Sequence, residues 1–519
     1  MRYSFRMPIN TSGEPRDCPK YLKLAKTFER QLRAGVLRVG DRLPSVRQLR
    51  THHRVSAATA VGCYMWLERQ GYVRARPKSG FFVSRTPQAE GPAPEISARA
   101  RGPLRINMGG LPIEATAVSD RSGYLDLGPA VVGAGLLPMA RLNRSLRLAL
   151  SAFTDNAVKY EDSRGNVRLR RQIAKLVFRQ GATCSPDDIV VTSGWTEAFN
   201  LSVRAIAKPG DVVAVETPGC YEVLRALEAL HMRAIEVPHV RGQGIDLNTL
   251  SAAVQKHRIK AVLLCVTCQN PIGECVTDER KAEIVEFAVR HDLPMIEGDS
   301  FGDLVFSGER PKPLKAFDKT GLVLQCSSLA HYVAPGFNLG WSNAGRYQAD
   351  VERLKALSNL ASARLPQLAM AEFLESGAYD KHVKQLRVAL WQSVEASREE
   401  VLRTFPKGTR VSKPQGGFVL WIQLPDGYDG VDLYRKAASA GINILPGAVF
   451  SPGGDYKSYV RIACGHTFEV MGPAIRTIAS LRDNSVILPR FLHPGSGGAL
   501  YFPRSWRPGS VLHGRASVS

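Results

Sequence analysis

The spacing of apolar residues predicts a small group of helices near the N-terminus, followed by two short strands. Over residues 20–34 the apolar positions recur close to the helical period, which predicts a first helix containing Leu22, Leu24, Ala25, Phe28 and Leu32. Two short helical patterns follow between residues 45 and 70, and two strand-like runs then flank a Lys-Ser-Gly turn at 78–80. This order predicts a helix-turn-helix with a β wing.

Serine residues mark where the two later helices begin. Ser45 and Ser56 each precede a helical run, so each hydroxyl can accept a hydrogen bond from an otherwise unpaired amide of the first turn. The second of these helices is predicted over roughly residues 57–70, and its small, polar first turn would let it approach a DNA major groove closely. The positions expected to be buried on it are Val61, Tyr64, Met65 and Leu67.

From residue 124 to about 481, strand-like apolar runs alternate with helical stretches. This alternation predicts an α/β domain built on a parallel sheet covered by helices. Residues 86–123 begin with a Pro-, Ala- and Arg-rich stretch without periodicity and are read as a linker between this domain and an N-terminal domain over residues 1–85. Residues 482–519 are rich in Gly, Pro, Ser and Arg and are predicted to be a disordered tail.

Length and charge agree with two domains and suggest a partner for the first. A chain of 519 residues, 44% hydrophobic and 22% charged, is too long for one core. Of its net charge of +22, residues 1–86 contribute an excess of 13 positive charges, from 18 Lys or Arg against 5 Asp or Glu. Charge alone leaves two interpretations open, a polyanion-binding surface or a basic face that keeps the domain soluble.

The nine cysteines are scattered through apolar contexts, which is typical of reduced thiols in a cytoplasmic protein. Cys265 and Cys268 form one C-x-x-C pair inside a strand-like run, and buried structural thiols are favoured there over a zinc or redox site, so no metal site is assigned. The sequence has no run of 18 apolar residues, and its N-terminus lacks the apolar segment of a secretion signal. We therefore expect a cytoplasmic location and no membrane partner.

Four short motifs in the N-terminal domain resemble the winged DNA-binding domain of the GntR family. They occur in order with the family's gaps: Leu-Pro-Ser-x-Arg at 43–47, Val-Ser-x-x-Thr at 55–59, Leu-Glu-x-x-Gly at 67–71 and Ser-Gly-x-x-Val at 79–83. The resemblance implies double-stranded DNA as the partner. It also implies that Arg47, Ser56 and Thr59 face the DNA and that Lys78, Ser79 and Gly80 form the tip of the wing. Ala57 departs from the pattern, because the family often has arginine there.

A second candidate site lies where a strand passes into a helix at residues 192–198. The sequence Thr-Ser-Gly-Trp-Thr-Glu-Ala follows a strand-like run and opens a helix, so several backbone amides should point to one place near the positive end of the helix dipole. This is a general anion-binding arrangement and by itself does not identify the ligand.

Larger motifs in the second domain resemble fold type I aminotransferases, over nearly all of residues 124–481. They are Tyr-x-x-x-x-Gly-x-x-x-Leu-Arg at 160–170, Gln-Asn-Pro-Ile-Gly at 269–273, Ala-Pro-Gly at 334–336 and Arg461 within Tyr-Val-Arg-Ile. The resemblance implies a mixed, mostly parallel sheet with helices on both faces, a small C-terminal α/β subdomain, and pyridoxal 5'-phosphate as the cofactor. By the same likeness, the ligand pocket contains Gly194, Trp195, Thr196, Asn270 and Arg461.

The chain departs from that family at the positions that perform its chemistry. His331 stands where the family has the lysine that forms an imine with the cofactor, and only a primary amine can do so. Asn338 replaces a phosphate-binding arginine, Phe301 replaces a tyrosine, and Gly298 replaces the aspartate that keeps the pyridine nitrogen protonated. Asp299 is adjacent to Gly298, but in a strand it would point to the opposite face. Covalent cofactor binding is therefore not expected, and no catalytic residue is assigned.

The order of the two domains resembles the MocR family of transcription regulators. The resemblance implies a homodimer that binds DNA and senses pyridoxal phosphate or an amino-type effector. For this chain we expect a small amino-acid-like or anionic effector, or none. Two alternatives remain open from the sequence. One is a pyridoxal phosphate-dependent aminotransferase, or a regulator that has retained the cofactor. The other is a large domain that serves only as a platform for dimerisation.

Overall fold

The computed structural model describes residues 19–33, 36–69, 71–76, 79–84, 91–96, 101–108, 123–151 and 159–481. The predicted wing residue Lys78 and the predicted tail 482–519 lie outside these ranges. Within them, no helix is long and apolar enough to cross a membrane.

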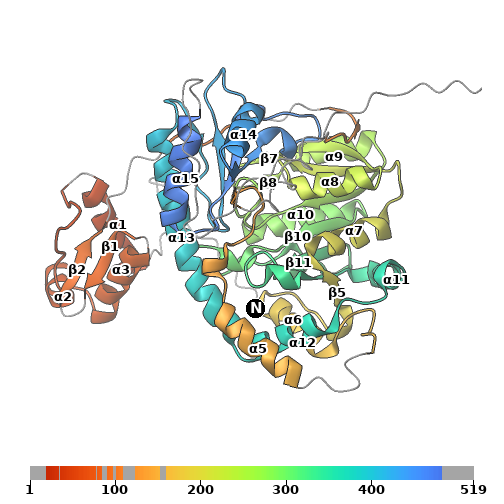
Figure 1. Ribbon diagram of the computed structural model, residues 1–519, viewed down its shortest axis with the longest axis horizontal. Coiled ribbons are helices and arrows are strands. Elements are labelled where there is room, and N and C mark those ends of the chain that lie inside the picture. The colour runs from red at the N-terminus through yellow and green to blue at the C-terminus, as the bar shows by residue number, and fades with distance from the viewer. Residues whose placement is uncertain are drawn as a thin grey trace, which may run out of the picture.

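The N-terminal domain is a winged helix-turn-helix (Figure 1). Its elements are α1 (Lys20–Arg33), α2 (Val46–His53), α3 (Ala57–Arg69), β1 (Val73–Arg76) and β2 (Gly80–Val83), and the two strands pair antiparallel. Both predicted serine caps are present. Ser45 accepts a hydrogen bond from the amide of Gln48 at 3.2 Å, and Ser56 accepts one from the amide of Thr59 at 3.1 Å. These caps fix the start of each helix.

The predicted buried face of α3 is only partly correct. Tyr64 and Leu67 are fully buried, but Val61 is 41% exposed and Met65 is 47% exposed. The buried stripe contains Ala60, Cys63, Tyr64 and Leu67, which are three or four residues apart and therefore share one face of a helix. Tyr64 stacks on Phe81 of the wing, with ring centroids 4.5 Å apart, so this stripe joins the helices to β2.

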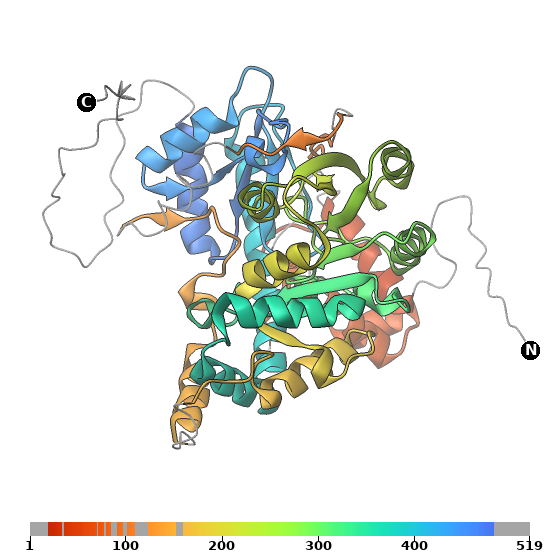
Figure 2. The ribbon, with the colours of Figure 1, turned by 90° about the vertical axis from the view of Figure 1, so that its right-hand side faces the viewer.

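The large domain is built on one mixed sheet that is parallel in its centre (Figures 1 and 2). In spatial order the strands are β3 (Leu104–Arg105), β7 (Arg233–Val240), β6 (Val212–Thr217), β9 (Ile259–Leu264), β10 (Met295–Gly298), β11 (Val323–Ser328), β12 (Leu339–Asn343) and β5 (Val190–Ser193), with β8 (Gly244–Ile245) paired to β7. Strands β7, β6, β9, β10 and β11 are parallel, whereas β12 runs antiparallel to both β11 and β5.

Helices cover both faces of this sheet. α7 (Gly194–Ile206) and α8 (Tyr221–Ala229) lie on one face, and α9 (Leu247–Lys256) and α10 (Asp278–Arg290) lie on the other. The domain also contains α5 (Met139–Ser151), α6 (Val167–Arg179) and α12 (Arg364–Glu375), of which α12 packs against the other two, and α11 (Gln348–Asn359), which packs against α7. Alternate residues of β6 join different cores: Val213 and Val215 belong to the core that includes α7 and α8, whereas Ala214 belongs to the core that includes α9 and α10. The predicted fold class is therefore confirmed.

The C-terminal subdomain has a sheet of its own. Its antiparallel strands are β13 (Arg410–Val411), β14 (Val419–Gln423), β17 (Tyr459–Ala463) and β16 (Leu445–Pro446), and its helices are α13 (Ala378–Thr404), α14 (Gly430–Ser439) and α15 (Phe468–Ser480). A short parallel pair joins β15 (Ile442–Asn443) to β4 (Leu125–Asp126). The winged domain lies beside the long helix α13 (Figure 1). A Cβ on Gly71, just after α3, would meet the ring of Trp391 of α13 at 2.8 Å.

The described parts of the predicted linker, residues 91–96 and 101–108, are attached to the large domain. Arg101 forms ion pairs with Glu236 at 3.3 Å and Asp455 at 2.9 Å, and Glu95 pairs with Arg410. Leu104–Arg105 form the edge strand β3. The aperiodic sequence did not indicate these contacts, because they are made by single polar side chains and a two-residue strand.

Candidate functional site

The predicted DNA-facing residues lie at the start of α2 and α3. The side chains of Arg47 and Ser56 are exposed, and Thr59 is half-buried with its hydroxyl 2.9 Å from that of Ser56. Ser79 and Gly80 lie exposed at the described end of the wing turn. Exposed basic residues continue along α2 and its C-cap, namely Arg50, His52, His53 and Arg54. A polyanion can therefore reach a contiguous positive segment here.

A small cavity lies at the carboxyl ends of the central strands of the large domain. Its lining includes Trp195 and Asn270, which were predicted for the ligand pocket. It also includes Gly298, Phe301 and His331, which differ from the residues of the aminotransferase family. Thr196 is exposed and does not line the cavity. The cavity volume is only ≈ 40 Å³, whereas ligand pockets commonly measure about 300–1,000 Å³.

His331 cannot replace a cofactor lysine in this environment. Its ring lies edge-on to Phe301, with centroids 5.2 Å apart, and its backbone carbonyl accepts a hydrogen bond from the amide of Val132. Burial lowers the pKa of His331, so the imidazole is neutral near physiological pH, and its buried Nδ1 has no hydrogen-bond partner among the described residues. An imidazole has no primary amine for an imine, and none of the residues lining the cavity is a lysine.

The start of α7, predicted as an anion site, is partly filled by the chain itself. The carboxylate of Glu197 accepts a hydrogen bond from the amide of Ser193 at 2.6 Å and is held by the buried Lys355 at 2.7 Å. Gly194 has φ +74°, and a Cβ there would lie 2.2 Å from Oδ1 of Asn338. A side-chain carboxylate and an amide oxygen thus lie beside the start of α7, where an anion would need hydrogen-bond donors.

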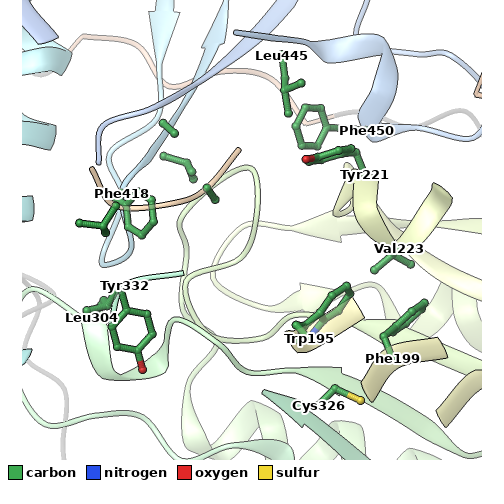
Figure 3. Close-up of a cluster of buried hydrophobic side chains, with 14 of the residues drawn as sticks. Trp195, Phe199, Tyr221, Val223, Leu304, Cys326, Tyr332, Phe418, Leu445 and Phe450 are labelled. Atoms are coloured by element: carbon green, nitrogen blue, oxygen red, sulfur yellow. The ribbon is translucent and has the colours of Figure 1, made fainter. Parts of the chain in front are cut away.

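Gly298 has no side chain, and the side chains of Cys265 and Trp195 lie close to the space where one would project. A Cβ on Gly298 would meet Sγ of Cys265 at 2.8 Å and the ring of Trp195 at 3.5 Å. Trp195 itself stacks on Phe199, with centroids 5.0 Å apart (Figure 3). Asp299 points away, as predicted, and pairs with Arg310 at 2.6 Å. The residues present at this cavity therefore do not fit pyridoxal phosphate, because the residues that would replace its lysine, arginine and aspartate partners cannot do their chemistry and the cavity measures only ≈ 40 Å³.

Arg461 is a buried charged residue close to the cavity. It is fully buried on β17, and Nη1 donates a hydrogen bond to Oδ1 of Asn270 at 3.3 Å, while Nε and Nη2 have no partner among the described residues. Its guanidinium faces the rings of Tyr221 and Phe450, which lie next to each other in Figure 3. Burial lowers the pKa of Arg461. These two buried donors could pair with an acceptor that the described residues do not supply, such as a carboxylate.

Two contacts in this region were not foreseen from the sequence. Lys355 reaches Glu197 from a helix 158 residues further along the chain, and no local pattern signals that pair. Cys268 and Cys275 lie with their sulfur atoms 3.9 Å apart. Their positions on either side of the Gln-Asn-Pro-Ile-Gly turn were a usable signal, because a turn brings its two ends together.

Comparisons with known proteins agree with both domains. Residues 140–478 match the family of class I and II aminotransferases, and residues 20–83 match the bacterial regulatory proteins of the gntR family. The HTH-type transcriptional regulator YdcR of Escherichia coli K12 is 35% identical over 85% of this chain and 94% of its own length. The regulator NorG of Staphylococcus aureus is 25% identical over 81% of this chain and 95% of its own length.

Among solved structures, the kynurenine aminotransferase of Pyrococcus horikoshii superposes with a TM-score of 0.66 at 26% identity, covering 72% of this chain and 94% of that protein. An archaeal alanine:glyoxylate aminotransferase gives a TM-score of 0.67 at 24% identity, covering 75% and 97%, and shows the fold alone. The winged domain, the aminotransferase fold and the regulators that share both together establish that the chain belongs to the MocR-type transcription regulators of the GntR family.

Proposed function

We propose that this transcription regulator binds DNA as a homodimer in the cytoplasm, and that its large domain senses a small anionic ligand without forming an imine with pyridoxal phosphate. The observation that carries the proposal is His331 in a cavity of only ≈ 40 Å³, in place of the lysine on which imine formation depends. The described lining of the cavity has no primary amine with which an aminotransferase reaction could begin, whereas the N-terminal domain contains the four GntR-type DNA-binding motifs.

The ligand is proposed to bind through its carboxylate at Arg461. The unpaired Nε and Nη2 can form a bidentate pair with a carboxylate, next to the amide of Asn270. Because the cavity is too small for an amino acid, binding requires the subdomain that carries Arg461 to move away from the central strands. The ligand would then favour an open arrangement by the difference between its affinities for the two states.

The attached segment before the large domain provides a route from that movement to the DNA-binding domain. Arg101 contacts Glu236 on β7 and Asp455 in the C-terminal subdomain, and Glu95 contacts Arg410 of that subdomain. A shift between the two parts would change these ion pairs. We propose that it thereby repositions the winged domains relative to each other, which alters affinity for paired DNA sites.

Exposed apolar residues support the homodimer. Phe178 on α6 is 72% exposed, and Leu148 and Leu150 on α5 are 45% and 49% exposed. Tyr160, at the position whose tyrosine in fold type I aminotransferases often reaches the phosphate of the partner subunit, is 85% exposed. Covering such side chains with a second copy of the chain is favourable, because it removes apolar surface from water.

The proposal is tested by measuring DNA affinity of the full-length protein by fluorescence anisotropy, using DNA from the region upstream of its own gene. We expect pyridoxal phosphate to leave the affinity unchanged, and at least one amino acid or dicarboxylate of a panel to change it. That response should vanish in Arg461→Met. A response to pyridoxal phosphate that survives in Arg461→Met would favour a cofactor-responsive regulator instead.

A further inference from the structure

Two cysteines close the ends of the loop that carries Asn270. The sulfur atoms of Cys268 and Cys275 lie 3.9 Å apart, and the backbone amide of Cys268 donates a hydrogen bond to Sγ of Cys275 at 3.3 Å. The loop between them is held by the hydrogen bond from the amide of Gln269 to the carbonyl of Glu274 at 2.9 Å. A disulfide requires an S–S distance of about 2.05 Å, so the two sulfurs need to approach by roughly 2 Å.

The two thiols differ in a way that suits stepwise oxidation. Cys268 is 3% exposed, whereas Cys275 is only partly buried and is the one that solvent can reach. The hydrogen bond from the Cys268 thiol lowers the pKa of Cys275, and the Cys268 amide and the nearby Lys281 add to that effect. The same hydrogen bond raises the pKa of Cys268. Cys275 is therefore the better nucleophile and Cys268 the thiol placed to react second.

We propose that Cys268 and Cys275 are a redox-active pair that forms a disulfide when the protein meets a peroxide. The thiolate of Cys275 attacks one peroxide oxygen and breaks the O–O bond, giving a sulfenic acid and, after protonation, one water molecule. The sulfur of Cys268 then attacks the Cys275 sulfur, its thiol proton joins the departing hydroxide, and a second water molecule leaves. The two thiols together lose two electrons and two protons, which reduce the peroxide to water.

The contacts of this loop connect a Cys268–Cys275 disulfide to the residues around Asn270 and Arg461. Sγ of Cys268 packs against Gly416, where a Cβ would lie 2.5 Å away, and the amide of Cys275 donates to Oε1 of Gln415 at 2.6 Å. Movement of either sulfur therefore changes how the loop meets residues 415–416. Asn270, the hydrogen-bond partner of Arg461, lies between the two cysteines. Oxidation would shift that partner whether or not Arg461 binds a ligand.

The test uses reduced full-length protein treated with a small excess of hydrogen peroxide, then alkylated in denaturant and digested with trypsin. Cys265, Cys268 and Cys275 all fall in the tryptic peptide 261–280, since Lys260 and Arg280 bound it. We expect that peptide to carry one alkyl group, on Cys265, instead of three. We also expect the chain to lose two of its nine free thiols and to regain both with dithiothreitol.

Matched variants distinguish this pair from its neighbours. Cys265→Ser should still form the bond, whereas Cys268→Ser should leave Cys275 as a sulfenic acid and retain no disulfide. Thermal unfolding of each variant shows that it is folded before oxidation. The proposal is overturned if the wild-type peptide keeps three alkyl groups, if Cys268→Ser still forms the bond, or if Cys265 is one of the linked residues.

Discussion

The sulfur of Cys265 occupies the space into which a side chain at position 298 would project. A Cβ on Gly298 would lie 2.8 Å from it. The absence of a side chain on Gly298 is therefore what leaves room for the sulfur of Cys265. Restoring the aspartate alone would not restore a cofactor site, because Cys265 and Trp195 are already there.

The first prediction concerns this pair. Gly298→Asp should lower the free energy of unfolding by about 2–4 kcal/mol, because it overpacks the site and buries a carboxylate. Adding Cys265→Ala should recover part of that loss by removing the sulfur. Urea unfolding of the two variants, with Cys265→Ala alone as the control, measures the coupling. Strictly additive effects would contradict the steric relationship.

The second prediction concerns DNA recognition. Arg47→Ala should weaken binding to specific DNA by about 1–3 kcal/mol and reduce discrimination against random duplex, because the exposed side chain lies at the start of α2. Arg290→Ala is the charge-matched control, since Arg290 is exposed on α10 of the large domain. Anisotropy at several salt concentrations should show steep salt dependence for both specific and random DNA. Equal losses in the two variants would show that only net charge matters.

The third prediction concerns the buried guanidinium. Arg461→Met should unfold at the same temperature as wild type or higher in the absence of ligand, because a buried charge with two unpaired donors is removed. In the presence of a carboxylate ligand found by thermal-shift screening, wild type should gain stability and the variant should not. A variant that unfolds well below wild type without ligand would assign Arg461 a structural role instead.

The fourth prediction concerns His239, a buried histidine beside the loop of residues 268–275. Nδ1 of His239 lies 2.8 Å from Glu216 and Nε2 lies 3.1 Å from Glu274. Burial lowers the pKa of His239, but the hydrogen bonds to both carboxylates outweigh it and raise the pKa to about 9.

Because the folded-state pKa is raised, the stabilisation is complete below the usual histidine pKa of about 6.5 and is lost as pH rises through about 9. The loss is on the order of 3 kcal/mol. Urea unfolding between pH 6.5 and 9.5 should show this decline in wild type and a flatter profile in His239→Gln. Parallel profiles would show that His239 is not charged in the folded protein.

Local patterns in the sequence were enough to predict the helix caps at Ser45 and Ser56, the wing, and the direction of Asp299. They misplaced Val61 and Met65, because α3 is short and several apolar stripes fit its sequence equally well. They could not show that the carboxylate of Glu197 accepts a hydrogen bond from the amide of Ser193, since Lys355 holds that carboxylate from a distant helix. They also could not show that the cavity at His331 is small, which depends on how side chains such as Cys265 and Trp195 pack in three dimensions.

The most direct test of the central claim is the reaction of the full-length protein with pyridoxal phosphate, followed in absorbance and, after borohydride reduction, by intact-mass spectrometry with peptide mapping. We predict no imine absorption band beyond that of an unrelated lysine-containing protein, and no single lysine modified stoichiometrically. One cofactor fixed per chain on one lysine would contradict the account, because it would show that the large domain retains covalent cofactor binding despite His331.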